Sequence, residues 1–94
     1  MPHYCYILRC ADAQYYVGAT ADLFPRLAAH RAGRVPSTRR RRPVTLVYYE
    51  VHATAAAAYQ RERSLKNGRT RKATREQLIH TFPPARLARF EGAL

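Results

Sequence analysis

The chain has 94 residues, among them 17 Lys or Arg and only 6 Asp or Glu, so its formal net charge is +11 at pH 7. A chain of this length buries one hydrophobic core, which predicts a single domain over residues 1–94 and excludes a deep cleft between two domains. Nearly all of the cationic residues are arginines. Because guanidinium groups bind phosphate through paired hydrogen bonds, the charge predicts a nucleic acid as partner and not a lipid surface.

The cysteines and the apolar runs indicate the setting in which the protein works. Cys5 and Cys10 are an odd number of positions apart in a predicted strand, so their side chains should lie on opposite faces, and no disulfide between them is expected. Without further cysteines, a structural zinc site is not expected either. The longest apolar run, residues 55–59, is far too short to cross a bilayer. We therefore expect a soluble protein of the reducing cytoplasm, without membrane contact.

The N-terminal part of the chain predicts a β-hairpin followed by a helix. Residues 3–9 and 14–19 are rich in aromatic and β-branched side chains, which favours two paired strands. Asp22 is a suitable N-cap for a helix that runs to about residue 32, and Gly33 follows at its expected end.

The rest of the chain predicts one more strand and further helices. Residues 34–42 form a loop with four consecutive arginines, and residues 44–51 are the strongest strand signal in the chain. Three more helices are expected, the first of them capped by Thr54 and ended by Gly68, at residues 55–67, 71–82 and 85–90. The order β-β-α-β-α-α predicts an α+β fold, in which a small three-stranded antiparallel sheet is flanked by helices.

Four side chains that can move protons or bind phosphate occur at regular spacing. Tyr6, Tyr16 and Arg26 are ten residues apart, and His30 follows Arg26 by four, which places Arg26 and His30 on one face of the predicted helix. Taken singly, each has a structural explanation, because tyrosines pack across hairpins, and helical arginine or histidine residues commonly face solvent. If that helix face looks onto the hairpin, two phenols, a guanidinium and an imidazole converge.

Glu62 lies in a stripe of the predicted helix 55–67 that should face the core. The stripe has helical spacing and consists of Ala55, Ala58, Tyr59, Glu62, Leu65 and Lys66. A buried carboxylate is costly unless it is paired, protonated or bound to a metal. Glu62 therefore predicts either a salt bridge with a neighbouring arginine or a site for a hard divalent cation such as Mg²⁺.

These positions, in this order, resemble the GIY-YIG nuclease domain. The segments 4–6 (Tyr-Cys-Tyr) and 16–18 (Tyr-Val-Gly) correspond to its two tripeptides, and Arg26, His30 and Glu62 follow them. The Tyr-Ile-Leu-Arg-Cys opening, the Arg-Arg-Pro-Val segment before the third strand and the basic segment after the glutamate are similar to the small stand-alone bacterial UPF0213 branch. The resemblance covers roughly residues 4–80, and it implies a GIY-YIG-like fold and hydrolysis of phosphodiester bonds.

The resemblance also implies a role for each matching residue. Glu62 would hold one Mg²⁺ (or Mn²⁺) ion, with water in the rest of its shell. Tyr16 would relay a proton from the attacking water, Tyr6 would orient the nucleophile or bond the phosphate, and Arg26 would stabilise the developing negative charge. His30 would bond a phosphate oxygen or assist proton transfer, and these two roles stay open.

Two further residues match the family pattern, and the sequence departs from that pattern in two places. Gly18 matches the closing glycine, which would allow close packing, and Asn67 would stand for an asparagine that often follows the glutamate. The first tripeptide has Tyr-Cys in place of Gly-Ile, and Gly68 stands where many relatives carry Trp. Neither departure removes a group to which the resemblance gives a catalytic role.

A surface for nucleic-acid phosphates is expected around the arginine-rich loop and the basic segment after the third strand. Such contacts position a nucleic acid without reading its sequence. We expect them from Arg39, Arg40, Arg41, Arg42, Arg61, Arg63, Lys66, Arg69, Arg71 and Lys72. The sequence contains no recognition motif for bases, so specificity would come from the shape of the nucleic acid or from a protein partner.

Together these features predict a divalent-metal-dependent endonuclease that acts on DNA and selects its structure rather than its sequence. One alternative is a nucleic-acid-binding module that keeps the fold but cleaves slowly or not at all. Another is a small protein-interaction domain whose tyrosines only pack, which would leave Glu62 in the stripe unexplained.

Overall fold

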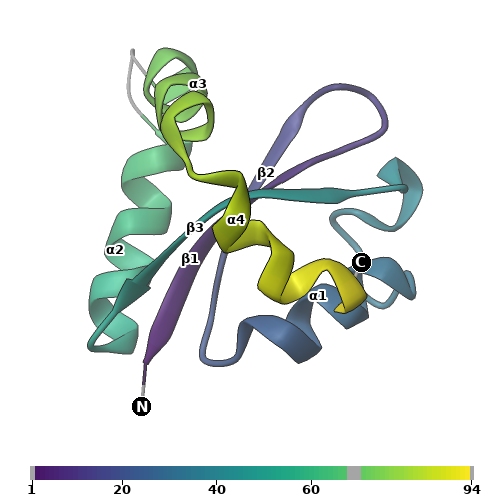
Figure 1. Ribbon diagram of the computed structural model, residues 1–94, viewed down its shortest axis with the longest axis horizontal. Coiled ribbons are helices and arrows are strands. Elements are labelled where there is room, and N and C mark those ends of the chain that lie inside the picture. Colours follow the sequence, from purple (N-terminus) through teal and green to yellow (C-terminus); the bar gives the residue numbers. More distant parts are fainter. Residues whose placement is uncertain (1, 68–70, 94) are drawn as a thin grey trace.

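A three-stranded antiparallel sheet is the centre of the computed structural model, which describes residues 2–67 and 71–93 (Figure 1). Its strands are β1 (His3–Arg9), β2 (Tyr15–Thr20) and β3 (Thr45–His52), and their order in the sheet is β2-β1-β3. The predicted three-stranded antiparallel sheet is therefore confirmed, with every strand within one residue of its expected start.

The central strand β1 is buried on both faces of the sheet. Cys5 and Tyr6 are both fully buried although their side chains point to opposite faces. In the register of the sheet, Tyr6 is opposite Gly18 of β2, and Cys5 is opposite Glu50 of β3. The register thus puts Tyr6 next to a residue without a side chain.

Two helices begin after the expected N-cap residues, but only the second of these residues makes a capping hydrogen bond with its side chain. Helix α1 (Leu23–Arg31) begins after Asp22, whose side chain makes no capping bond, and the chain leaves it through Gly33 with φ +79°. Helix α2 (Ala55–Lys66) begins after Thr54, whose Oγ1 accepts a hydrogen bond from the Ala57 N–H at 3.2 Å. The predicted end of α2 at Gly68 lies outside the described residues.

The C-terminal part differs from the expected single helix over residues 85–90. After α3 (Arg71–Thr81), a short helix α4 (Pro84–Leu87) continues into a 3₁₀ segment, η2 (Ala88–Ala93). A second 3₁₀ turn, η1 (Arg39–Arg41), lies in the arginine-rich loop. Phe90 of η2 packs edge-on against Tyr49 at 5.1 Å between ring centroids, so this part of the chain covers the sheet.

The helices divide between the two sides of the sheet (Figure 1). Figure 1 shows α2 and α3 on one side, and α1, α4 and η2 on the other. On the second side, Phe24 of α1 and Phe90 of η2 are in contact at 6.3 Å between ring centroids. Helix α1 therefore lies over the face of the sheet to which Tyr6 points.

Cys5 and Cys10 are both free and buried, and Cys10 lies just beyond the end of β1. Burial raises the pKa of the Cys5 thiol to about 12, with a further contribution from the negative charge of Glu50. Within the described parts of the chain, no helix has the length and apolar character needed to cross a bilayer.

Candidate active site

Tyr6 is the centre of a buried cluster of polar side chains between the sheet and α1. Its ring has no exposed surface. Its hydroxyl is 2.7 Å from His30 Nε2, and Arg26 Nε donates a longer hydrogen bond of 3.4 Å to the same oxygen. Because Arg26 and His30 are one helical turn apart on α1, both reach Tyr6 from the same face of the helix. The spacing seen in the sequence thus corresponds to a real convergence in space.

Tyr16 of β2 completes this cluster by packing against the same rings. Its ring centroid is 6.3 Å from that of Tyr6 and 5.1 Å from that of His30. Unlike Tyr6, it is only partly buried. The cluster therefore has a buried tyrosine in its interior and a second tyrosine that reaches solvent.

Gly18 makes room for the Tyr6 ring. A Cβ atom at this position would lie 2.5 Å from the Tyr6 hydroxyl oxygen and 2.6 Å from Cζ, much closer than any real contact. The side chain of Tyr6 lies over the backbone of β2, which only glycine permits. The expected role of Gly18 in close packing has this physical cause.

The electrostatic environment keeps His30 neutral and Tyr6 protonated near pH 7. Burial, together with the positive charge of Arg26, lowers the pKa of His30 to about 4. Burial raises the pKa of the Tyr6 phenol above its usual value, against the opposing effect of the hydrogen bond from Arg26. That same hydrogen bond raises the pKa of Arg26. A neutral imidazole can accept a hydrogen bond from that phenol, and the positive charge of Arg26 lies beside the phenol oxygen.

Thr38 belongs to this cluster, although sequence reasoning did not select it. It is fully buried, and its Oγ1 is 2.7 Å from His30 Nδ1. Both ring nitrogens of His30 therefore have partners, one from the sheet and one from the loop after α1. A threonine in a loop eight residues from the histidine has no periodicity that would reveal this contact.

Glu62 of α2 is linked to Tyr16 through Lys66. Lys66 Nζ donates a hydrogen bond to Glu62 Oε2 at 2.9 Å and lies 5.7 Å from the centre of the Tyr16 ring. Among the described residues, the ion pair of Glu62 is therefore with the lysine one turn along α2 and not with an arginine, which was one of the two expected alternatives. The Glu62 side chain is 20% exposed, so the carboxylate remains accessible.

The stripe of α2 that faces the sheet is narrower than predicted. Ala58 and Leu65 are buried as expected, whereas Tyr59 is 54% exposed. Positions 58, 62 and 65 repeat at intervals of four and three residues and point to the sheet, while position 59 is turned about 100° from position 58. The inclusion of Tyr59 in the core-facing stripe was therefore wrong, and Glu62 keeps its place on the inner side.

The donor set around Glu62 fits a metal bound mainly by water. Among residues 2–67 and 71–93, no group of three or more His, Cys, Asp or Glu side chains is placed to hold an ion. Magnesium commonly uses one or two carboxylates and takes its other ligands from water and substrate phosphate. In the described structure only Oε2 of Glu62 is bonded, to Lys66, so the carboxylate has the chemistry that such an ion needs.

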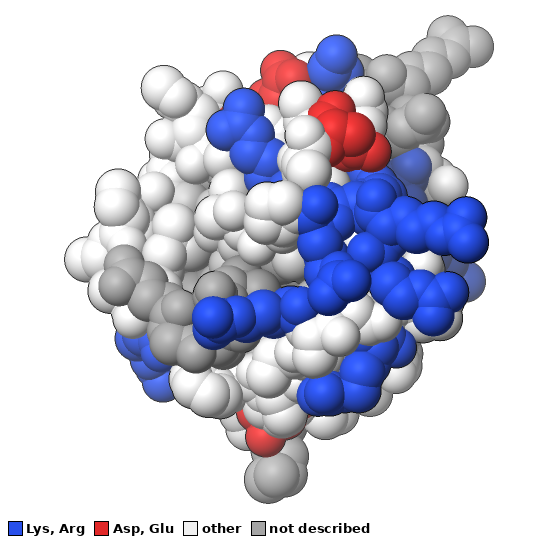
Figure 2. All heavy atoms as spheres, turned by 90° about the vertical axis from the view of Figure 1, so that its right-hand side faces the viewer, with Lys and Arg blue, Asp and Glu red and all other residues white. Residues whose placement is uncertain are grey.

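The predicted phosphate-binding residues form two separate groups. The loop with Arg39–Arg42 precedes β3, whereas Arg61, Arg63 and Lys66 belong to α2 after it, and Figure 1 shows these segments on opposite sides of the molecule. Figure 2 shows Lys and Arg side chains gathered on the side that carries the loop. Arg69 and the side chain of Arg71 lie outside the described structure. The single surface expected from sequence is therefore divided.

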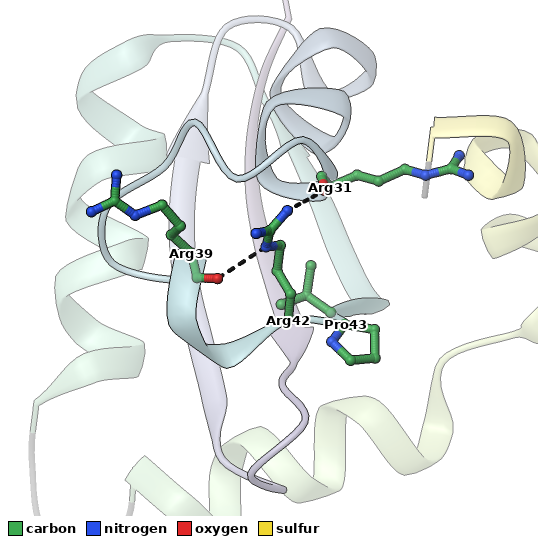
Figure 3. Close-up of a pocket in the computed structure, with 5 residues that line it drawn as sticks. Arg31, Arg39, Arg42 and Pro43 are labelled. Atoms are coloured by element: carbon green, nitrogen blue, oxygen red, sulfur yellow. Dashed lines mark hydrogen bonds between the residues drawn. The ribbon is translucent and has the colours of Figure 1, made fainter.

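Several of these cations also hold the structure together. Arg42 donates from Nε to the Arg39 carbonyl at 2.9 Å and from Nη1 to the Arg31 carbonyl at 3.2 Å, which ties the loop to the end of α1 (Figure 3). It lines a pocket of about 420 Å³ together with Arg31, Arg39, Pro43 and Val44. In Figure 3 the guanidinium groups of Arg31 and Arg39 point away from each other, so they do not converge on one ligand.

A second polar cluster, missed in the sequence, surrounds Glu50 on the opposite face of the sheet. Its carboxylate accepts hydrogen bonds from the Tyr48 hydroxyl, from His52 Nε2 at 2.8 Å and from Arg61 Nε at 2.8 Å. Burial opposes ionisation, but these three donors prevail and lower the pKa of Glu50. Arg61, predicted as a phosphate ligand, is thus also the partner of a carboxylate.

Comparison with known proteins identifies relatives over most of the chain. Residues 2–76 match the family model of the GIY-YIG catalytic domain. A UPF0213 protein of Streptococcus pyogenes serotype M5 is 48% identical over 69 residues, which cover 72% of this chain and 75% of that protein. A UPF0213 protein of Bacillus pumilus is 45% identical over 71 residues, 74% of this chain and 72% of that protein.

A solved structure agrees with the fold described above. The solution NMR structure of a UPF0213 protein from Bacillus halodurans has 36% sequence identity and a TM-score of 0.53. The alignment covers 85% of this chain and 84% of that one. The α+β arrangement of a three-stranded sheet with flanking helices is thus shared with an experimental structure.

Proposed function

Because the chain belongs to the GIY-YIG catalytic domain family, we propose that it is an endonuclease that hydrolyses phosphodiester bonds in DNA. One observation carries this proposal. Tyr6, Tyr16, Arg26 and His30 meet in one cluster, although they come from two strands and a helix, and Lys66 links the Glu62 carboxylate to the Tyr16 ring.

The exposed rim of the cluster supplies the groups that meet the substrate. Tyr16 lies at this rim beside Glu62 and Lys66, where it can accept or pass on a proton of the attacking water. Arg26 is partly buried and fixed by its bond to Tyr6, so its charge is held ready for the negative charge that develops on the phosphate. Phosphodiester hydrolysis needs both functions.

Glu62 would hold the divalent ion, Mg²⁺ or Mn²⁺. When bound, such an ion lowers the pKa of a coordinated water and neutralises charge on the phosphate. Lys66 occupies one oxygen of Glu62, and an exposed ion pair of this kind is worth at most about 1 kcal/mol. Lys66 would therefore release Glu62 at little cost when the carboxylate holds an ion, and the lysine would then be available to the substrate.

The buried part of the cluster supports this rim. Tyr6 has no exposed surface, so it orients its neighbours and does not itself contact phosphate. His30 is neutral near pH 7 and lies within hydrogen-bonding distance of the Tyr6 hydroxyl, so the pair holds one proton between its two heteroatoms. Of the two roles left open for His30, direct contact with a phosphate oxygen is disfavoured, because the imidazole is fully buried.

Substrate contacts outside the cluster would come from the two basic groups. Arginine and lysine side chains on the loop and on α2 neutralise backbone phosphates without reading bases. Because these groups lie on opposite sides of the molecule, a bent or branched DNA could touch both, whereas a short straight duplex could not. We therefore propose selectivity for DNA structure, with any sequence preference supplied by a protein partner.

The test is cleavage of labelled branched, nicked, duplex and single-stranded DNA, and of matched RNA, with Mg²⁺ or Mn²⁺. Glu62→Gln is compared with Glu76→Gln, which alters an exposed glutamate of α3, and Tyr16→Phe is compared with Tyr59→Phe on the exposed side of α2. We expect Glu62→Gln and Tyr16→Phe to abolish cleavage while DNA binding persists, and the controls to cleave normally.

Two outcomes would overturn the proposal. If Glu62→Gln lost DNA binding but the remaining complexes still cleaved at the normal rate, Glu62 would not take part in chemistry. If the wild type bound every DNA tightly and cut none with either metal, the chain would be a nucleic-acid-binding module that keeps the fold of a nuclease.

A further inference from the structure

Thr38 and His30 form a buried contact to which the proposed function gives no role. Thr38 lies just before η1, in the loop that joins α1 to β3, and it has no exposed surface. Its Oγ1 is 2.7 Å from His30 Nδ1, which matches the 2.7 Å between His30 Nε2 and the Tyr6 hydroxyl. The imidazole is thus held between one oxygen from the loop and one from the sheet.

The donors around Tyr6 indicate which nitrogen of His30 carries the proton. Arg26 Nε can only donate, so the Tyr6 oxygen accepts from it. In the described structure, His30 is the other side-chain partner of this hydroxyl, and a buried hydroxyl proton without an acceptor is costly. The same holds for the buried hydroxyl of Thr38, and a neutral imidazole accepts from only one of these two neighbours. A phenol is a better donor than an aliphatic hydroxyl, and the adjacent charge of Arg26 strengthens this difference, so the Tyr6 hydroxyl donates to Nε2.

A neutral imidazole carries a hydrogen on only one of its two nitrogens, so the bond at Nε2 determines the bond at Nδ1. If Nε2 accepts, Nδ1 carries the hydrogen and donates it to Thr38 Oγ1. We infer that Thr38 is a positioning residue, which holds His30 in the Nδ1–H tautomer so that Nε2 stays available to the proton of Tyr6. The expected effect of Thr38 on cleavage rests on the proposed function, whereas its expected effect on the tautomer of His30 does not.

The loop that contains Thr38 also carries exposed basic side chains. Thr38 points inward, while its neighbour Arg39 is exposed among the basic side chains of the same loop. Arg42 fastens that loop to the end of α1 through the Arg31 carbonyl. The segment that we expect to touch nucleic acid is therefore also the segment that sets the orientation of His30.

The experiment compares Thr38→Val, which removes the hydroxyl and keeps the shape, with Thr38→Ser, which keeps the hydroxyl. Thr45→Val, at an exposed position of β3, is the matched control. The tautomer of His30 is read from its ¹⁵N chemical shifts in ¹⁵N-histidine-labelled protein at pH 7, and amide spectra show that each variant is folded. Cleavage of DNA with Mg²⁺ is measured in parallel as kcat and KM.

We expect Nδ1–H in the wild type, in Thr38→Ser and in Thr45→Val, and a mixture of tautomers in Thr38→Val. We also expect kcat to fall roughly tenfold in Thr38→Val with KM little changed, because one hydrogen bond of about 1.4 kcal/mol is lost. A wild-type His30 with its proton on Nε2, or a folded Thr38→Val with an unchanged tautomer, would overturn the inference. A tautomer that changes as expected in a protein without nuclease activity would uphold it and reject only the proposed function.

Discussion

Lowering the pH should destabilise the protein through His30. The imidazole is fully buried, and burial beside Arg26 lowers its pKa from 6.5 to about 4. The unfolded chain therefore takes up a proton at higher pH than the folded protein does. The contribution of the neutral His30 to the free energy of unfolding is therefore full above pH 6.5, and it is lost as the pH falls from 6.5 toward 4.

The size of the loss follows from the difference between the two pKa values. One pKa unit corresponds to about 1.4 kcal/mol, so the free energy of unfolding should fall by about 2 kcal/mol at pH 5 and about 3 kcal/mol at pH 4. The groups that face His30 are Arg26 on its own helix, Tyr6 and Tyr16 from the sheet, and the uncharged Thr38 from the loop. Among them only Arg26 contributes a positive charge, and it opposes protonation throughout this range.

Urea unfolding between pH 7.5 and pH 4 would test this reasoning. Wild type is compared with His30→Gln, which cannot titrate, and carboxylates that titrate in both proteins cancel in the difference between their free energies of unfolding. His80→Gln, at an exposed position of α3, should follow the wild type throughout. If the difference between wild type and His30→Gln stayed constant from pH 7.5 to pH 4, His30 would not be buried in the neutral state, and the proton arrangement argued above would fail.

Two further predictions concern packing and charge on either side of the sheet. Gly18→Ala should lower the free energy of unfolding by about 1–3 kcal/mol, because its Cβ would lie 2.5 Å from the Tyr6 hydroxyl; urea unfolding would contradict this if the loss were under about 0.5 kcal/mol. Glu50→Gln should cost about 1–2 kcal/mol at pH 7, because the carboxylate accepts charge-assisted bonds from Arg61 and other donors. The pKa of Glu50 is lowered from its ordinary value of 4.5, so the cost of the substitution should shrink as the pH falls below 4.5. Equal costs at pH 3 and pH 7 would refute this explanation.

Local signals in the sequence predicted the framework of the fold. The strand β1 was found at its expected bounds, since its aromatic and aliphatic residues suit a strand buried on both faces. The end of α1 was set by Gly33, whose φ of +79° few other residues adopt. The start of α2 was set by the side chain of Thr54. In each case the information lies within a few residues of the element that it determines.

Contacts across the fold could not be predicted in the same way. Thr38 is polar and follows Pro36 and Ser37 in a loop, a pattern that is typical of an exposed turn, yet it is fully buried against His30. The donors of Glu50 come from β3 and α2, and only the packed structure shows that they meet. Glu62 is different, because its partner Lys66 lies one turn along the same helix, and this spacing could have predicted the pair from the sequence.

The two tyrosines of the family motif differ in exposure, and this difference separates their roles. Tyr6 is sealed beneath α1, with its hydroxyl between His30 and Arg26. A fully buried group cannot meet a DNA strand unless α1 moves, so its chemistry must pass through neighbours. Tyr16 rests on the same imidazole but reaches the surface beside Lys66. If the protein is a nuclease as proposed, Tyr16 is therefore the tyrosine that contacts water and phosphate. Tyr6 holds His30 and Arg26 in position beside it.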